Sequence, residues 1–208
     1  MQSEFPEEVF APLKAAYDSY TIPIYGERFN SGKGRSQSMG ILPRRNYGVG
    51  ESRNNESWPD ILREARKLAA IICPDLNYTT IMVNIDYTAL PHMDKNNDGE
   101  SVVVGFNEYS GGELVANGIS HNIRHRPFRF RASETLHSVS PITAGTRYSI
   151  VFFRPRFPRA FQEKYGTTLT YDELYALIPL REVGAASFRG ADPGVGLVFS
   201  TSRDTSSF

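Results

Sequence analysis

The chain has 208 residues, 40% of them hydrophobic, and its 23 basic and 23 acidic residues give a formal net charge of zero. This length favours a single domain with a substantial core, and the neutral balance argues against a surface that coats nucleic acid. The sequence has no apolar run long enough for a transmembrane helix, an acidic start that predicts no secretory signal, and a single cysteine, Cys73, which excludes an intrachain disulfide. We therefore expect a soluble intracellular protein, cytoplasmic, or nuclear if the source is eukaryotic.

The N-terminal part, residues 1–77, is predicted to contain two helices and an irregular segment. Apolar side chains share one helical face over residues 6–19. Residues 21–56 are rich in Gly, Ser, Asn and Arg, which predicts irregular structure, with a mobile loop over residues 29–38. A second helix is expected from Ser57, as its cap, to Cys73-Pro74.

From residue 78 the chain changes to short β-forming runs separated by turns. The predicted strands cover residues 79–87, 101–106, 111–115, 123–131, 135–140 and 147–154. Asn117-Gly118 is a strong hairpin signal. Many short strands at this spacing favour a β-sandwich or barrel.

The sequence therefore predicts one domain over residues 1–183, with its β core at 78–155. Residues 156–183 are predicted to return to helix, with a cap signature from Thr170 to Glu173. The Gly- and Ser-rich residues 184–208 are expected to form a loosely ordered tail.

One short stretch combines side chains that bind metal ions. His92 and Asp94 are two positions apart, so on a strand they share a face, and His137 follows near the start of a later strand. Two imidazoles and one carboxylate on one side of a metal form the facial triad of non-haem Fe(II) oxygenases. We predict these three residues as metal ligands and, through the metal, as the catalytic residues. His121 and His125 are rival ligands, but a spacing of four joins two ligands well on a helix and poorly on a strand.

Arg147, ten residues after His137 (147 − 137 = 10), begins a second candidate binding motif. Arg147 and Ser149 share a face if their segment is a strand, and a guanidinium with a hydroxyl can bind a carboxylate. The alternative is a strand arginine at a domain edge with a solvated partner. The offset of Arg147 from His137 favours the ligand interpretation, in which Arg147 binds the far carboxylate of a 2-oxo acid.

In order and spacing these residues resemble the Fe(II)- and 2-oxoglutarate-dependent dioxygenase superfamily, over roughly residues 79–154. The resemblance implies a mainly β fold with flanking helices, namely a double-stranded β-helix or cupin-like jelly roll with iron at its open mouth. It implies Fe(II), 2-oxoglutarate and O2 as cofactors. It also implies that Asn84 and Tyr87 contact 2-oxoglutarate, whereas the alternative for Asn84 is a structural role in its strand. Tyr47-Gly48 is faintly similar to an element of oxygenases that act on 5-methylpyrimidines in nucleic acids.

Three hypotheses remain open for the function. The first is hydroxylation of an extruded nucleobase in DNA or RNA, with arginines on phosphates. The second is hydroxylation of a free amino acid or nucleoside, or of a protein side chain. The third is a jelly roll without catalysis that serves as a binding or structural module. The candidate substrate residues are Arg44, Arg45, Asn46, Asn96, Arg124 and Arg126. For the arginines the alternative is a solvated strand face with cross-strand ion pairs. Asn96 and Asn97 either orient the triad or form a plain turn.

Overall fold

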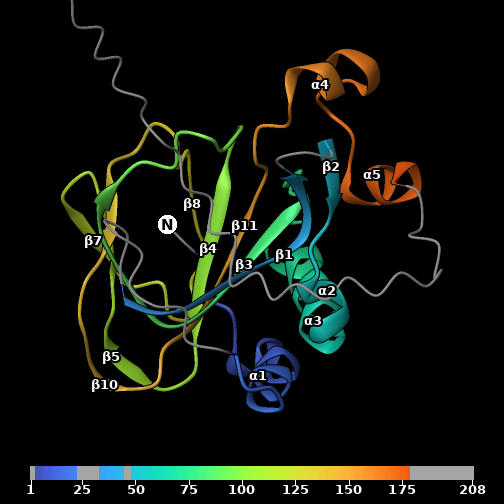
Figure 1. Ribbon diagram of the computed structural model, residues 1–208. Coiled ribbons are helices and arrows are strands. Elements are labelled where there is room, and N and C mark those ends of the chain that lie inside the picture. Colours follow the sequence, from blue (N-terminus) through green and yellow to red (C-terminus); the bar gives the residue numbers. More distant parts are fainter. Residues whose placement is uncertain (1–2, 23–32, 45–47, 179–208) are drawn as a thin grey trace, which may run out of the picture. The chain divides into compact units, whose positions relative to one another are not determined.

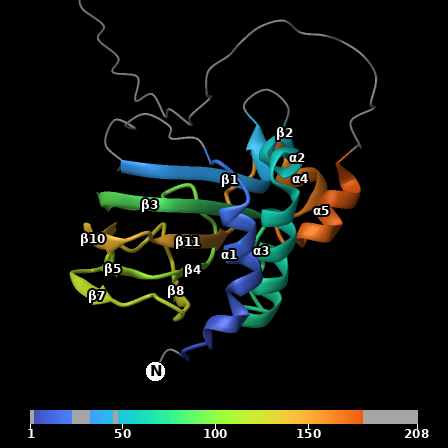
Figure 2. The ribbon, with the colours of Figure 1, turned by 90° about the horizontal axis from the view of Figure 1, so that it is seen from below.

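The computed structural model describes residues 3–22, 33–44 and 48–178 of the chain. Within them, mostly antiparallel strands form a nearly closed, barrel-like jelly roll with a few flanking helices (Figures 1 and 2). The fold class predicted from the sequence is therefore confirmed. The strands are β1 (Lys33–Arg44), β2 (Gly48–Glu51), β3 (Thr80–His92), β4 (Ser101–Phe106), β5 (Tyr109–Gly111), β6 (Leu114–Ala116), β7 (Ile119–His121), β8 (Phe128–Phe130), β9 (His137–Val139), β10 (Ile142–Gly145) and β11 (Tyr148–Phe153).

The long strand β3 connects the two sides of the barrel. Its first part pairs with β1 on one side and β11 on the other, and β11 continues to β4 and β8. Its last part pairs instead with β9, after a register irregularity between Ala89 and His92. Asp86 has a positive φ of 49°, which an aspartate adopts more readily than most side chains. The strand thus pairs with β11 up to Ile85 and with β1 up to Thr88, and it ends at His92 opposite β9.

Alternation along β3 separates an apolar face from an inner face. Ile81, Val83 and Ile85 belong to the main hydrophobic cluster, together with residues of α1 (Ala11–Asp18) and α3 (Pro59–Ile72). These helices cover the outer face of the sheet formed by β1, β3, β11, β4 and β8 (Figure 2). The other parity, which includes Asn84, therefore faces the interior of the barrel.

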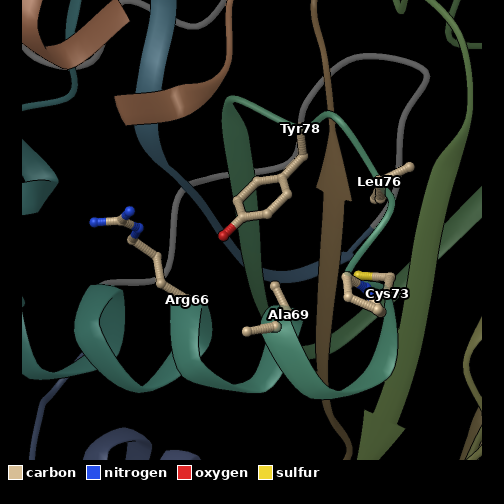
Figure 3. Close-up of a pocket in the computed structure, with 7 residues that line it drawn as sticks. Arg66, Ala69, Cys73, Leu76 and Tyr78 are labelled. Carbon is tan, nitrogen blue, oxygen red and sulfur yellow. The ribbon is translucent and has the colours of Figure 1, made fainter. Parts of the chain in front are cut away.

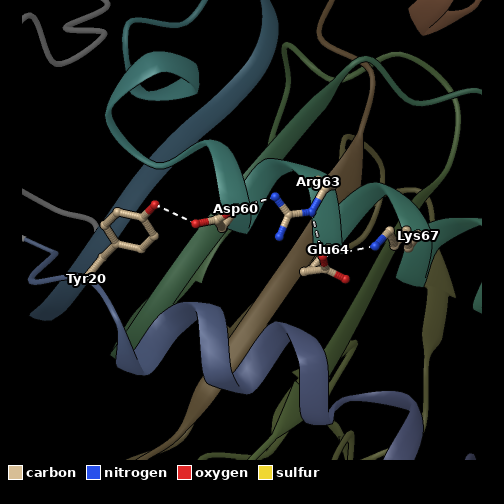
Figure 4. A network of polar contacts seen from close by, with 5 residues as sticks. All are labelled: Tyr20, Asp60, Arg63, Glu64 and Lys67. Atoms are coloured by element: carbon tan, nitrogen blue, oxygen red, sulfur yellow. Dashed lines mark hydrogen bonds and ion pairs between the residues drawn. The ribbon is translucent and has the colours of Figure 1, made fainter.

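Polar contacts on the outside of α3 connect it to the segment after α1 (Figure 4). The Tyr20 hydroxyl donates to Asp60 Oδ2 over 2.9 Å, and Arg63 bridges Asp60 and Glu64. Lys67 Nζ donates to Glu64 Oε1 over 3.1 Å. Exposed ion pairs of this kind contribute about 0–1 kcal/mol each, so the apolar face of the helix supplies most of its stabilisation.

The predicted irregular segment at residues 21–56 is wrong where the structure describes it. Residues 33–44 form β1, residues 48–51 form β2, and residues 54–57 form the short helix α2. Residues 35–40 of β1 pair with residues 80–85 of β3, and this ladder overrides the low strand propensity of the Gly- and Ser-rich sequence. Of the predicted mobile loop over residues 29–38, residues 33–38 belong to β1 and residues 29–32 lie outside the described residues, as do 23–28 and 45–47 of the wider segment.

Several local predictions also need adjustment. Helix α3 begins at Pro59 and has Trp58 at its N-cap, without a side-chain cap from Ser57. Only residues 128–130 of the predicted strand 123–131 are β, since the positive φ of His125 (58°) interrupts the extended backbone. A short 3-10 helix, Glu7–Val9, precedes α1 within the predicted helix 6–19.

The C-terminal region contains two helices, α4 (Arg159–Tyr165) and α5 (Tyr171–Leu177). The predicted cap signature is confirmed, because Thr170 and Glu173 form a reciprocal capping box at the start of α5. The predicted hairpin at Asn117-Gly118 is confirmed too, since both residues have positive φ and join β6 to β7. The predicted tail at 184–208 lies outside the described residues.

Candidate metal centre

The structure brings His92, Asp94 and His137 together at one end of the barrel. His92 is the last residue of β3 and lies opposite His137, the first residue of β9. Asp94 follows β3, and its N–H donates to the carbonyl of Ala132 over 2.9 Å. One ligand atom from each residue lies within 4.8 Å of the others, so a single ion can contact all three. The group consists of two nitrogens and one oxygen, which is the facial-triad set of non-haem Fe(II) sites.

Both imidazoles are held in the orientation that a metal requires. His92 Nδ1 lies 2.7 Å from the carbonyl oxygen of Leu90, and His137 Nδ1 lies 2.9 Å from that of Thr135. Each Nδ1–H therefore donates to a backbone carbonyl, which leaves Nε2 unprotonated as the ligand atom. The Nε2 atoms point to Asp94, at 3.5 Å from Oδ1 for His92 and 3.8 Å from Oδ2 for His137.

The surroundings support the same protonation state. Burial lowers the pKa of His137, which is 7% exposed, and the neighbouring His92 lowers it further, against opposing effects of the Thr135 carbonyl and Asp94. His137 is thus kept neutral, as metal binding needs. Asn97 Nδ2 donates to Asp94 Oδ2 over 3.4 Å, so Asn97 contacts the triad, as the orienting alternative to a plain turn predicts.

A buried polar pocket surrounds Arg147, which immediately precedes β11. The guanidinium is 2% exposed, and its Nη1 donates to Ser149 Oγ over 2.9 Å and to the carbonyl of Tyr87 over 3.4 Å. Ser149 lies opposite Asn84 of β3, so their side chains share the inner face. Burial lowers the pKa of Arg147. The guanidinium is therefore a desolvated cation to which no carboxylate of the described residues is bonded.

Three buried polar atoms here, Arg147 Nε, Asn84 Oδ1 and the Tyr109 hydroxyl, form no well-aligned hydrogen bond within the described part of the chain. Tyr109 nevertheless interacts with the guanidinium and partly offsets the lowering of the pKa of Arg147. Unpaired buried polar atoms cost free energy, and a bound ligand is one source of the missing bonds. The Tyr109 ring centre lies 5.8 Å from the guanidinium carbon of Arg147. The observed atoms fit a polar, anionic ligand beside Arg147.

Two glycines give this pocket its shape. A Cβ on Gly112, which has a φ of 65°, would lie 2.6 Å from Arg147 Cδ. A Cβ on Gly105 would lie 2.3 Å from the Tyr109 hydroxyl oxygen. Only the absence of a side chain at these positions lets Arg147 and Tyr109 occupy their places.

Sequence reasoning missed Tyr109. Tyr109 is in β5. Its hydroxyl lies against Gly105 of β4, which is opposite Ser149 of β11 and has no side chain to occupy that space. No motif or spacing in the sequence connects Tyr109 with Arg147, so only the pairing of β4 with β11 could have identified it.

Of the described candidate substrate residues, Arg44 lies away from the triad. Lys33 of β1 lies opposite Thr88 and Gly40 lies opposite Thr80, which puts Arg44 beyond the end of β3 that is remote from His92. Arg45 and Asn46 lie outside the described residues. Asn96 is exposed, and its backbone carbonyl accepts from the N–H of Arg156 over 2.7 Å.

The arginines of residues 124–131 are engaged in ion pairs. Arg124 bonds Glu108 at 3.0 Å and Arg126 bonds Glu4 at 2.6 Å. Arg129 and Arg131 also pair with carboxylates, Arg129 with Asp75 and Glu100, and Arg131 with Glu134. These contacts correspond to the solvated ion-pair alternative rather than to a row of free phosphate-binding arginines.

The two rival histidines are not part of the triad. His125 stacks on Phe10 at 4.8 Å between ring centres, and burial lowers its pKa. His121 packs against Phe128 at 4.2 Å. The metal-capable group among the described residues contains neither.

A separate pocket of about 210 Å³ lies at the C-terminal end of α3 (Figure 3). It is lined by Arg66, Ala69, Ala70, Cys73, Pro74, Leu76 and Tyr78. Arg66 is bonded to Asp172 at 2.6 Å, and burial raises the pKa of Cys73 to about 12. This pocket therefore offers neither a free cation nor a reactive thiolate.

The fold and the triad together define a double-stranded β-helix of the type used by Fe(II) oxygenases. The structure of NgTET1 in complex with 5mC DNA is similar, with a TM-score of 0.54, 15% sequence identity and coverage of 80% of this chain and 71% of that one. An oxidoreductase of the 2OG-Fe(II) oxygenase family from Burkholderia pseudomallei is similar with a TM-score of 0.50 and 16% identity, covering 74% of this chain and 84% of that one. The chain therefore has the fold of the 2OG-Fe(II) oxygenases.

Sequence-level comparison adds nothing to this likeness. No family model matches the chain, and no curated protein matches it.

Every helix within residues 3–22, 33–44 and 48–178 is too short or too polar to cross a membrane.

Proposed function

We propose that the protein is an Fe(II)- and 2-oxoglutarate-dependent dioxygenase that hydroxylates a C–H bond of its substrate. The observation that carries the proposal is the position of two Nε2 atoms around Asp94, with each imidazole fixed by a backbone carbonyl on its Nδ1, in a domain that also buries Arg147. When bound, Fe(II), 2-oxoglutarate and O2 supply the oxidation, in which R–H, 2-oxoglutarate and O2 give R–OH, succinate and CO2.

The residues of the chain have separate tasks in this proposal. His92, Asp94 and His137 hold the metal and leave its remaining positions open. Arg147 and Ser149 bind the far carboxylate of 2-oxoglutarate by charge-assisted hydrogen bonds. Asn84 and Tyr109 supply polar atoms that form no well-aligned hydrogen bond within the described residues, and Tyr87 contributes the carbonyl that orients Arg147.

The identity of the substrate remains part of the proposal. The likeness to NgTET1, which is bound to 5mC DNA in its structure, supports a nucleobase in nucleic acid as the substrate. The ion-paired arginines and the zero net charge support the alternative, a free small molecule or a protein side chain.

The decisive experiment measures iron content and succinate production. Protein reconstituted with Fe(II) is expected to retain about one iron per chain and to convert 2-oxoglutarate slowly to succinate even without a primary substrate. A panel of oligonucleotides, nucleosides and amino acids then identifies the class that accelerates turnover. A protein that holds no iron and forms no succinate is a non-catalytic jelly roll, and the proposal fails.

A further inference from the structure

A series of rings starts at the metal triad and runs along the mouth of the barrel. The ring centres of His92 and His137 are 4.3 Å apart, and Phe130 meets His137 edge-on at 5.1 Å. Phe128 lies 5.5 Å from Phe130, and His121 lies 4.2 Å from Phe128. Each ring is within the range at which aromatic side chains interact with the next. We call the last three members, His121, Phe128 and Phe130, the aromatic wall.

Next to the two imidazoles, the strand register places a small and then an aliphatic side chain on the same face of the sheet. His92 lies opposite His137, His137 opposite Ala116, and Ala116 opposite Ile119. Partners in antiparallel strands present their side chains on the same face, so Ile119 lies on the face that carries the imidazoles. Ile119 is 63% exposed and belongs to the edge strand β7. A large apolar side chain exposed on the metal-binding face is available to contact a substrate.

The base of this region is apolar as well. Phe128 and Phe130 are partly buried and pack against the cluster of Val103, Leu114 and Ile123. Both phenylalanines come from β8, which pairs with β4, and Phe130 contacts His137 of β9, which pairs with β6. The space beside the metal is thus bordered by rings and aliphatic groups on both sides.

Charge near the wall is neutralised within the chain. Arg129, between the two phenylalanines, points to the other face of its strand and bonds Asp75 and Glu100. Arg131 pairs with Glu134 at 3.4 Å. These two arginines are therefore not free to bind a phosphate or carboxylate of a substrate at the wall.

From these observations we infer that the aromatic wall binds an uncharged planar ring and positions its C–H bond toward the metal. The inference rests on the proposed function and names its substrate class. A ring stacked on an aromatic side chain typically gains on the order of ten- to a hundredfold in affinity, without any charged contact. Such a ring comes either from a nucleoside or from an aromatic side chain.

The test measures ligand affinity by calorimetry, with the full chain loaded with Fe(II) and 2-oxoglutarate under anaerobic conditions. Thymidine and N-acetyl-phenylalanine amide provide planar rings from the two sources, and the tighter of the two identifies the source. N-acetyl-proline amide provides an uncharged ring that is not planar, and a ten-residue oligothymidylate adds phosphates. We expect one planar-ring probe to bind at least about tenfold more tightly than the proline amide. We expect oligothymidylate to gain nothing over thymidine and its affinity to be insensitive to salt.

Variants connect the binding to the wall. Phe128→Leu retains apolar bulk and is expected to weaken the planar-ring probe about tenfold. Ile119→Asp, at an exposed position that tolerates polar groups, is expected to weaken it by roughly threefold. Phe161→Leu, in the partly buried aromatic cluster of α4, is the matched control and should leave the affinity unchanged.

The outcomes separate this inference from the proposed function. Three results would overturn the inference and leave the oxygenase proposal intact. They are tightest binding of the proline amide, an oligothymidylate affinity that falls steeply with salt, and wild-type affinity in both variants. A protein without iron or succinate production would remove the proposed function itself.

Discussion

The substitution Gly112→Ala tests whether the pocket beside Arg147 binds 2-oxoglutarate. A Cβ at this position would lie 2.6 Å from Arg147 Cδ, closer than such atoms approach, and 3.1 Å from Nε, which is also crowded, so the Arg147 side chain must shift. Hydrogen bonds to charged groups contribute about 1.5–3 kcal/mol, and misplacing Arg147 removes that amount from the binding of the far carboxylate. We expect the KM for 2-oxoglutarate to rise roughly ten- to a hundredfold.

The variant also carries a cost in stability that has to be measured separately. Gly112 has a φ of 65°, and an alanine there costs about 1–2 kcal/mol in backbone conformation, with about 1–3 kcal/mol more from the crowded neighbour. Gly166→Ala is the matched control, because Gly166 has a φ of 83° and nothing within 4 Å of the added Cβ. The control should lose the backbone contribution alone and keep the wild-type KM.

The assay follows succinate production against 2-oxoglutarate concentration, with chemical denaturation of both variants for the free energy of unfolding. Iron content should be unchanged in Gly112→Ala, because the three ligands lie on β3, its following turn and β9. A wild-type KM for Gly112→Ala, in protein whose unfolding shows the predicted loss of stability, would refute the assignment of Arg147 to the co-substrate.

Three further predictions concern other parts of the chain. His137→Ala should abolish both iron retention and succinate production, whereas His125→Ala should retain iron, and the opposite result would show that the wrong distal ligand was chosen. The thiol of Cys73 is 2% exposed and its pKa is raised to about 12, so in native protein at pH 8 it should react with a disulfide reagent only at the rate of unfolding, and rapid labelling would contradict its burial. Hydrogen bonds from the Thr170 N–H and hydroxyl lower the pKa of Glu173 in the folded state, so its stabilising effect is complete above the unfolded pKa and is lost as the pH falls through the lower folded value. Denaturation between pH 3 and 6 should therefore show a weaker acid dependence in Glu173→Gln than in wild type, and an identical dependence would argue against the capping box.

Much of the fold follows from local sequence patterns. The uninterrupted apolar run of β4 and the reciprocal partners Thr170 and Glu173 have the structures predicted for them, because burial and capping are decided by residues close in sequence. Strand β1 is the counterexample. Its Gly- and Ser-rich sequence has little strand propensity, and it is a strand because β3 pairs with it.

The candidate site divides in the same way. The sequence by itself determined the ligand types of the triad and the spacing of His92 and Asp94, because two residues on one strand have a fixed relation. It also marked Arg147 and Ser149, which are bonded to each other in the structure. The grouping of Arg124 and Arg126 as substrate contacts was less informative, since nearby carboxylates that no local pattern identifies neutralise both.

Only the tertiary structure decided what surrounds the metal. Tyr109 reaches Arg147 because Gly105 leaves room for its hydroxyl, and Phe130 reaches His137 because β8 pairs with β4 across the barrel. These contacts depend on strand register and on the closing of two sheets upon each other. A sequence pattern fixes which side chains alternate along one strand, but the partners of that strand are chosen by packing of the whole domain, and the shape of the pocket follows from that choice.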